Sequence, residues 1–188
     1  MAELPLDRVF TDQAGGDENF PGFLLVNHGK SQLADQKALA KAYAQTCLKA
    51  IDVGLDDLQT SEAAYPALFL ARHTLELYLK GLVADWDKQR PKTSNRHAID
   101  YLVDILSAEL KQDYHDHEVA ALSKFLTQIS MIDPKSMAFR YQDGAIVSLQ
   151  DAPIDDPEIW INFQHLKQSL SLTFEALDRI WTKRISTP

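Results

Sequence analysis

The chain has one cysteine, few glycines and no long hydrophobic run, and each shortage excludes a class of protein. Cys47 has no partner for an intrachain disulfide, and the N-terminal residues MAELPLDRVF contain neither the basic segment nor the apolar stretch of a signal peptide. The longest apolar run, residues 63–71, has about half of the roughly 20 residues that a membrane-spanning helix needs. These shortages predict a soluble, cytoplasmic protein with no membrane association.

Positive charge is also scarce. The chain has 19 Lys and Arg residues against 27 Asp and Glu residues, a net charge of −8. Proteins that bind nucleic acid usually carry a surplus of basic side chains that replaces the condensed counterions. An RNA-binding function would therefore need a local basic patch, and residues 88–96 are the one such cluster in the sequence. No glycine-rich loop precedes a helix with the spacing of a phosphate-binding loop.

The length and the apolar content predict one domain. A chain of 188 residues with 45% hydrophobic residues can build a single sizeable core. Glycine and proline pairs in residues 1–30 predict an extended arm, and residues 31–183 are expected to form the domain. Within that domain, apolar residues recur at three-to-four spacing and predict about five helices. The expected helices begin near Ser31 or Asp35, Ser61, Ser94 or Asn95, Glu118 and Asp156.

One segment has the pattern of a small hairpin. In MAFRYQDGAIVSLQ, two short alternating runs flank Asp143-Gly144, a pair that favours a two-residue turn because both positions accept a positive φ. This predicts a β-hairpin near residues 138–149. The expected fold class is therefore all-α, a single-domain helical bundle with one small β-hairpin.

The second expected helix carries charged residues on an otherwise apolar surface. In FLARHTLELYLKGLV, residues 69–83, the side chains of Arg72, Glu76 and Lys80 fall within an arc of about 80°, with His73 at its edge. The other positions are mostly apolar, so several neighbouring helices should pack around this one. These four residues, the polar stripe, either form an ion-pair ladder worth a few tenths of a kcal/mol per pair or border a groove open to a ligand.

Two further residues are candidates for chemistry. His97 is expected in the first turn of the third helix, where the positive end of the helix dipole favours a neutral imidazole that can act as a base. Arg140 lies between Phe139 and Tyr141 in a strand-like segment, so its side chain should point opposite to theirs. Convergence of Arg72, His97 and Arg140 beside a concavity would indicate a site; a partly exposed histidine and a solvated arginine are the alternatives.

We expect no metal and no cofactor. His115 and His117 in YHDHE would point about 200° apart on a helix, and no further ligand cluster accompanies them. Cys47 lies on the apolar side of the first expected helix, which predicts a core residue and not a nucleophile.

Three segments together resemble a known family. ALFLARHTLELYLKGLV, RHAIDYLVDIL and DPKSMAFRY look like parts of the HEPN superfamily of small all-α domains, over about residues 65–141. The resemblance implies a dimer that acts in toxin–antitoxin, abortive-infection or RNA-processing systems, as a ribonuclease, an inactive partner or a nucleotide-binding module. The family's catalytic pattern is an arginine, a polar residue, and a histidine a few residues later. Arg72-His73 supplies the first two positions without a histidine at the expected distance, and Arg90 is followed by Pro91, with six residues between Arg90 and His97.

Three functions are consistent with these patterns. A metal-independent endoribonuclease would use His97 to take the proton from a ribose 2′-hydroxyl and Arg72 or Arg140 to stabilise the phosphorane. A noncatalytic module would bind a nucleotide, an RNA or an antitoxin-type protein partner, and a structural ion-pair stripe would bind nothing. The acidic charge and the incomplete motif favour the module, expected as a homodimer. Its ligand-binding residues would be His73, Glu76, Lys80, Arg96 and Tyr141.

Overall fold

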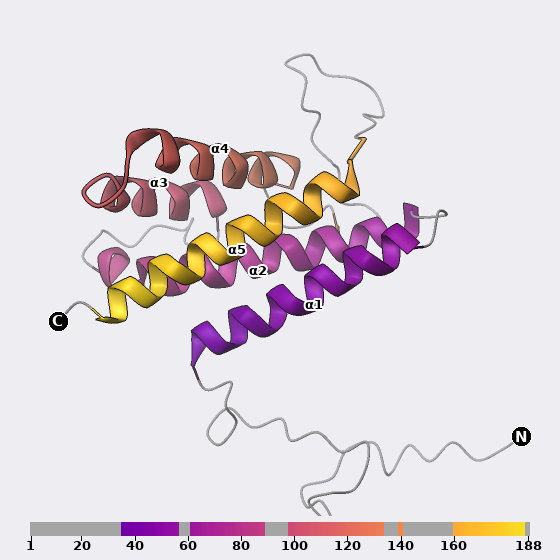
Figure 1. Ribbon diagram of the computed structural model, residues 1–188, viewed down its shortest axis with the longest axis horizontal. Helices are drawn as coiled ribbons and strands as arrows, with labels where there is room; N and C mark the ends of the chain where they lie inside the picture. Colours follow the sequence, from indigo (N-terminus) through magenta and orange to yellow (C-terminus); the bar gives the residue numbers. More distant parts are fainter. Residues whose placement is uncertain (1–34, 57–60, 89–97, 134–138, 141–159, 187–188) are drawn as a thin grey trace, which may run out of the picture. The chain divides into compact units, whose positions relative to one another are not determined.

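The computed structural model describes residues 35–56, 61–88, 98–133, 139–140 and 160–186. Five helices account for almost all of these residues, within one compact unit that spans Asp35–Pro188 (Figure 1). None of the described helices is both long enough and apolar enough to cross a membrane. The extended arm expected in residues 1–30 lies outside the described residues. In chain order the helices are α1 (Gln36–Asp56), α2 (Ser61–Lys88), α3 (Ile99–Leu110), α4 (Asp116–Ile132) and α5 (Phe163–Ser186).

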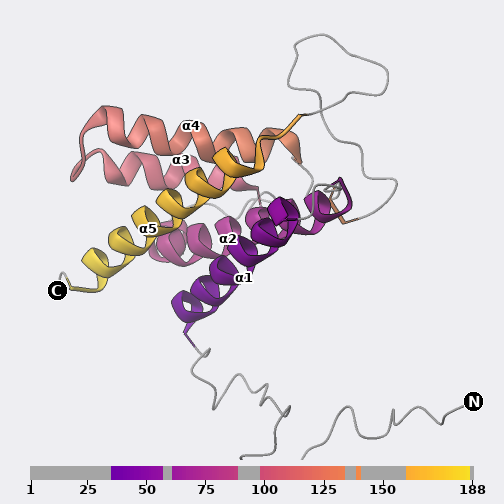
Figure 2. The ribbon, with the colours of Figure 1, turned by 45° about the vertical axis from the view of Figure 1, so that its right-hand side comes forward.

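Helix α2 is the centre of the bundle. It contacts each of the other four helices, while α3 pairs with α4 and α5 returns to pack on α1 (Figures 1 and 2). This arrangement confirms the prediction that a helix with apolar residues on most sides has several neighbours. Each large apolar side chain that it buries contributes about 1.5–3 kcal/mol through removal from water. The apolar residues of α2 in the core are Ala67, Leu68, Ala71, Leu75, Tyr78, Leu79, Leu82 and Val83.

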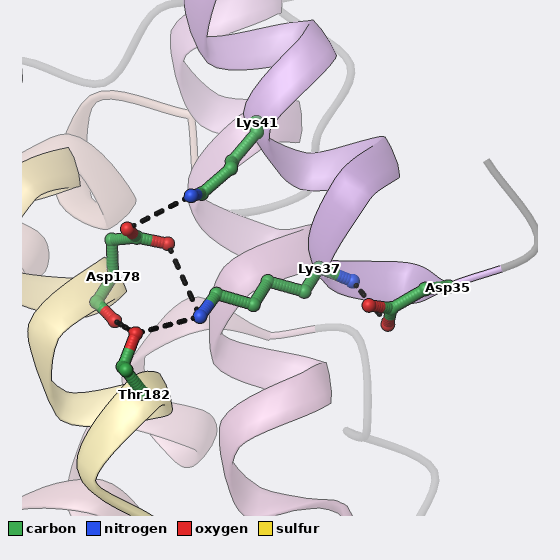
Figure 3. A network of polar contacts seen from close by, with 5 residues as sticks. All are labelled: Asp35, Lys37, Lys41, Asp178 and Thr182. Carbon is green, nitrogen blue, oxygen red and sulfur yellow. Dashed lines mark hydrogen bonds and ion pairs between the residues drawn. The ribbon is translucent and has the colours of Figure 1, made fainter. Parts of the chain in front are cut away.

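Ion pairs and a hydrogen bond connect α5 to α1 beside this core. Lys41 Nζ lies 3.0 Å from a carboxylate oxygen of Asp178, and Lys37 Nζ lies 3.6 Å from the other (Figure 3). Lys37 Nζ also donates a hydrogen bond of 2.7 Å to Thr182 Oγ1. Burial, together with the nearby Asp178 carboxylate, raises the pKa of Tyr78 to about 12, so this core phenol stays neutral.

Side-chain caps define the beginnings of α1 and α5. Asp35 Oδ1 accepts a hydrogen bond of 3.0 Å from the backbone N–H of Lys37, so Asp35 is the cap of α1, one of the two predicted starts. Asn162 does the same for α5, because its Oδ1 accepts from the backbone N–H of His165 at 2.9 Å. The predicted start of this helix near Asp156 was therefore wrong. The asparagine satisfies a first-turn donor and places the start at Phe163.

Helix α3 also begins later than predicted. Its N-cap is Ala98, which makes no side-chain cap, so Ser94 and Asn95 are not the caps that the sequence indicated. The first helical residue, Ile99, is completely buried, so packing fixes this end of the helix. His97 consequently precedes the N-cap and is not in the first helical turn, and its own position lies outside the described residues.

The described residues contain no strand. Phe139 and Arg140, the described members of the hairpin predicted near 138–149, are in a turn. Residues 141–149 lie outside the described part, so the structure gives the hairpin no support. Phe139 is buried and Arg140 is exposed, but both lie in a turn, so the strand alternation predicted for them does not apply.

Candidate functional site

The polar stripe of α2 forms a continuous ion-pair ladder. Its charged residues follow one another at four-residue steps, which places them on the same face of the helix. Arg72 Nη1 lies 3.3 Å from Glu76 Oε2, and Lys80 Nζ lies 2.7 Å from Glu76 Oε1. The carboxylate of Glu76 therefore sits between two cations, one buried and one partly exposed.

Arg72 at the inner end of the ladder joins α2 to α4. Its Nε donates a hydrogen bond of 3.0 Å to the backbone carbonyl of Asp133 and lies 3.8 Å from the Asp133 carboxylate. Asp133 is the C-cap of α4, where a cation complements both the carbonyls left without intrahelical partners and the negative end of the dipole. Only 2% of Arg72 is exposed, so its guanidinium lies inside the bundle and favours a structural role.

An aromatic stack lies beside the ladder on the same face of α2. The guanidinium carbon of Arg140 lies 5.1 Å from the ring centroid of Phe69. Phe69 stacks on His73 with centroids 5.8 Å apart and an angle of 11° between the rings. Tyr43 of α1 then meets His73 edge-on at 4.8 Å. The aromatic stack, Arg140, Phe69, His73 and Tyr43, thus runs from an exposed guanidinium into the contact between α1 and α2.

His73 is a neutral imidazole in this setting. Burial is the main cause that lowers its pKa below the ordinary 6.5, and the positive charges of Arg140, Lys80 and Arg72 lower it further, while Glu76 acts in the opposite direction. A neutral imidazole offers one hydrogen-bond donor and one acceptor. The contact of Arg140 with Phe69, and of Phe69 with His73, places Arg140 beside the polar stripe.

The structure brings together five of the residues singled out in the sequence. Three others, Arg96, His97 and Tyr141, lie outside the described residues, so their part in a site stays a prediction. The five that share one region are Arg72, His73, Glu76, Lys80 and Arg140.

The predicted angle of about 200° between the side chains of His115 and His117 was wrong, because it assumed that both residues are helical. His115 is the N-cap of α4, and its ring stacks on that of His117 at 5.7 Å and 13° instead of pointing away from it. The residues that the structure describes contain no group of three or more His, Cys, Asp or Glu side chains suited to hold a metal ion.

Cys47 is a core residue, as predicted. It is fully buried in α1, and its Sγ lies 3.8 Å from the carbonyl oxygen of Ala67. Burial raises the pKa of the thiol to about 12, which keeps it protonated and unreactive at neutral pH.

Sequence reasoning missed a cavity of about 250 Å³ at the other end of α2. The residues around it come from three helices and one turn, so their spacing along the chain carries no signal of their proximity. The one signal in the sequence was the pair of basic residues in the last turn of α5, Lys183 and Arg184, where positive charge complements the helix dipole. The charged and aromatic residues that line the cavity are Trp86, Glu109, Asp113, Tyr114, Lys183 and Arg184.

Comparisons with protein-family models, with curated proteins and with solved structures found no significant match to this chain.

Proposed function

We propose that the chain is a noncatalytic helical module that binds a nucleotide or a short single-stranded RNA at the aromatic stack. The exposed guanidinium of Arg140, held over Phe69, is the observation that carries the proposal. A guanidinium plane can stack on a nucleobase, and its N–H groups can pair with a phosphate in a bidentate manner. The ring stack beneath it fixes the orientation of Phe69 and keeps this platform in place.

The charge distribution supports a short ligand over a long one. With a net charge of −8, the surface as a whole does not attract a polyanion. Arg140 and the partly exposed Lys80 place positive charge on one face of α2, but Glu76 already pairs with Lys80, so together they can neutralise about one phosphate. The dependence of binding on salt should accordingly be shallow.

The position of Arg72 supports a noncatalytic module over a ribonuclease. A charge stabiliser has to reach the developing phosphorane, whereas the Arg72 guanidinium is buried against Glu76 and Asp133. In this proposal Arg72 positions α2 and the end of α4. The ribonuclease alternative would depend on His97 as base and Arg140 as charge stabiliser, and a purely structural or protein-binding ladder is the third possibility.

The binding experiment compares two exposed arginines. The thermal midpoint of the full chain is measured with and without adenosine 5′-monophosphate and a short oligouridylate, since preferential binding to the folded state raises it. We expect the midpoint to rise for wild type and for Arg179→Leu on α5, and to stay unchanged for Arg140→Leu. If the ligand raised the thermal midpoint equally in both variants, the aromatic stack would not be the binding site. If the ligand did not raise the midpoint of wild type, the proposal of a binding module would be wrong and the polar stripe would have only a structural role.

Cleavage is tested in the same samples. The proposal expects single-stranded RNA to remain intact in the presence of EDTA. Cutting that leaves 2′,3′-cyclic phosphate ends, and that is lost in His97→Ala, would replace the module with the ribonuclease.

We further propose, from the resemblance to the HEPN superfamily, that the module is a homodimer with a defence or toxin–antitoxin role and an antitoxin-type protein partner. Five large apolar side chains are exposed among the described residues, and a dimer interface would cover those that lie in it. They are Val53, Tyr65, Met131, Trp160 and Leu172, with Trp160 the most exposed at 91%. Light scattering should give twice the chain mass, and a monomer at high concentration would contradict the dimer.

A further inference from the structure

The C-terminal ends of α2, α3 and α5 lie on the same side of the bundle (Figure 1). Residues from these three ends line the cavity that the sequence did not reveal. Trp86 comes from the end of α2, Glu109 from the end of α3, and Lys183 from the end of α5. The turn before α4 adds Tyr114. Trp86 and Phe69 are separated by about 25 Å along α2, so this cavity is distinct from the aromatic stack.

The lining of the cavity holds cations against aromatic faces. Lys183 Nζ lies 5.0 Å from the ring centroid of Tyr114, and Arg184 Cζ lies 3.8 Å from that of Trp86. Lys183 Nζ also lies 3.2 Å from a carboxylate oxygen of Asp113. An aromatic face together with a carboxylate is an arrangement that recognises ammonium and guanidinium groups.

The charge balance favours a cationic ligand. Two basic and two acidic side chains line the cavity, and their formal charges cancel: Lys183 and Arg184 against Glu109 and Asp113. Each helix C-terminus that ends here adds roughly half a negative charge. The sum is negative, so a cation is attracted and an anion is repelled. Apolar surface from Leu110 and Ile180 offers a wall for an aliphatic stem.

We propose that this cavity binds a small organic cation, an aliphatic amine or guanidinium on a short methylene stem. Its charged head takes the place over Tyr114 and beside Asp113 that Lys183 occupies in this structure. Lys183 can leave, because 51% of its side chain is exposed and its pair with Asp113 is a surface ion pair of small energy. The apolar stem of the ligand then lies against Leu110 and Ile180.

The ligand class is tested by calorimetry on the full chain at constant ionic strength. Three five-carbon probes carry end groups of different charge: 1,5-diaminopentane is cationic, 1,5-pentanediol is neutral and glutarate is anionic. The diamine should bind, and the diol and glutarate should not. A fourth probe, Nα-acetyl-lysine methylamide, separates two sources of the amine, because tighter binding of this probe than of the diamine identifies a lysine side chain of a protein partner. Absence of diamine binding, or glutarate binding as tightly as the diamine, overturns the proposal.

Two matched pairs of variants locate the binding site. Asp113→Asn should weaken diamine binding about tenfold through loss of a charged hydrogen-bond partner, while Asp104→Asn, an exposed change of equal charge on α3, should leave it unchanged. Lys183→Met should strengthen binding severalfold because the internal competitor is gone, and Lys124→Met on the exposed face of α4 should have no effect. Equal effects within either pair mean that the diamine binds the surface non-specifically, and the cavity is then not its site.

Discussion

The guanidinium of Arg72 connects two helices that have few other contacts. It is shared between Glu76 on its own helix and the end of α4, and it is almost completely buried. Removal of one partner from a buried ion pair is costly because the charge left behind loses part of its compensation. Without Arg72, Glu76 would keep its pair with Lys80, and the buried Asp133 would lose the guanidinium.

Arg72→Met should lower the free energy of unfolding by about 3 kcal/mol. Arg179 pairs with Glu175 at the same spacing on the exposed face of α5, at 3.9 Å, so Arg179→Met is a matched control. That variant should change stability by less than about 0.5 kcal/mol. Urea unfolding measures both, and equal effects would show that burial adds nothing to the ladder.

The buried imidazole of His73 should make stability depend on pH. Burial lowers its pKa in the folded state below the ordinary 6.5, so below about pH 6.5 the unfolded chain binds more protons than the folded one. The stability that the neutral imidazole contributes is present above about pH 6.5 and is lost as the pH falls toward the folded-state pKa. Thermal midpoints between pH 8 and pH 5 should fall less steeply for His73→Gln than for wild type. His165→Gln, at an exposed position on α5, should follow wild type; a slope for His73→Gln identical to that of wild type would contradict the assignment.

The sequence predicted one half of the candidate site. Helical periodicity is local, so it placed the residues of the polar stripe on one face of α2 without tertiary information. The partner of Arg72 is 61 residues away, and no spacing rule connects the two. Asp133 ends α4, and its contact with Arg72 depends on how α4 packs against α2.

At the scale of elements, the packing of Trp181 of α5 against α2 depends on a glycine. A Cβ atom at Gly81 would lie 1.8 Å from Cη2 of Trp181, a distance that no packing tolerates. Gly54 of α1 differs, because a Cβ there would meet its nearest atoms, in Ala63 and Phe163, at an ordinary 3.5 Å.

Gly81→Ala should destabilise the protein by about 1–3 kcal/mol, because Trp181 has to move or change rotamer. Gly54→Ala should leave stability unchanged or raise it by up to about 1 kcal/mol, since alanine is the better helix former. The midpoints of denaturant unfolding for Gly81→Ala and Gly54→Ala, each compared with wild type, test both expectations. In a Trp181→Leu background the cost of Gly81→Ala should largely disappear, and an undiminished cost would place the conflict elsewhere.

The ends of helices were predicted less well than their interiors. Interior residues repeat a pattern many times, whereas an end depends on one cap or one contact. For α5, the sequence predicted a start near Asp156, but the cap is Asn162. For α3, the buried Ile99 fixes the start although Ala98 offers no side-chain oxygen. Packing of Ile99 decided the start of α3, whereas the Asn162 cap decided that of α5, so the sequence signals chosen for these two starts were wrong.

At the scale of the molecule, the all-helical character and the five helices of the described residues followed from the sequence, whereas the positions where helices meet did not. Apolar residues on most sides of α2 predicted its central place. The cavity at the ends of α2, α3 and α5 gave no comparable signal, because it depends on the lengths and crossing directions of three separate helices.

Helix α5 differs from the others in how its contacts are distributed along the chain. The pairs α1–α2, α2–α3 and α3–α4 join consecutive helices, whereas α5 packs on α1 and α2, so Lys37 and Thr182 meet across 145 residues. Closing so long a loop costs more conformational entropy than closing a short one. We therefore expect the first four helices to assemble among themselves and α5 to dock last and detach first. Native-state hydrogen exchange should show amides of α5 opening at a lower free energy than those of α2, and equal values would mean one cooperative unit.

Detachment of α5 would have two effects at once, because its residues cover Tyr78 and also line the cavity at Lys183. A single local unfolding event would therefore expose part of the core and the proposed amine site to solvent together.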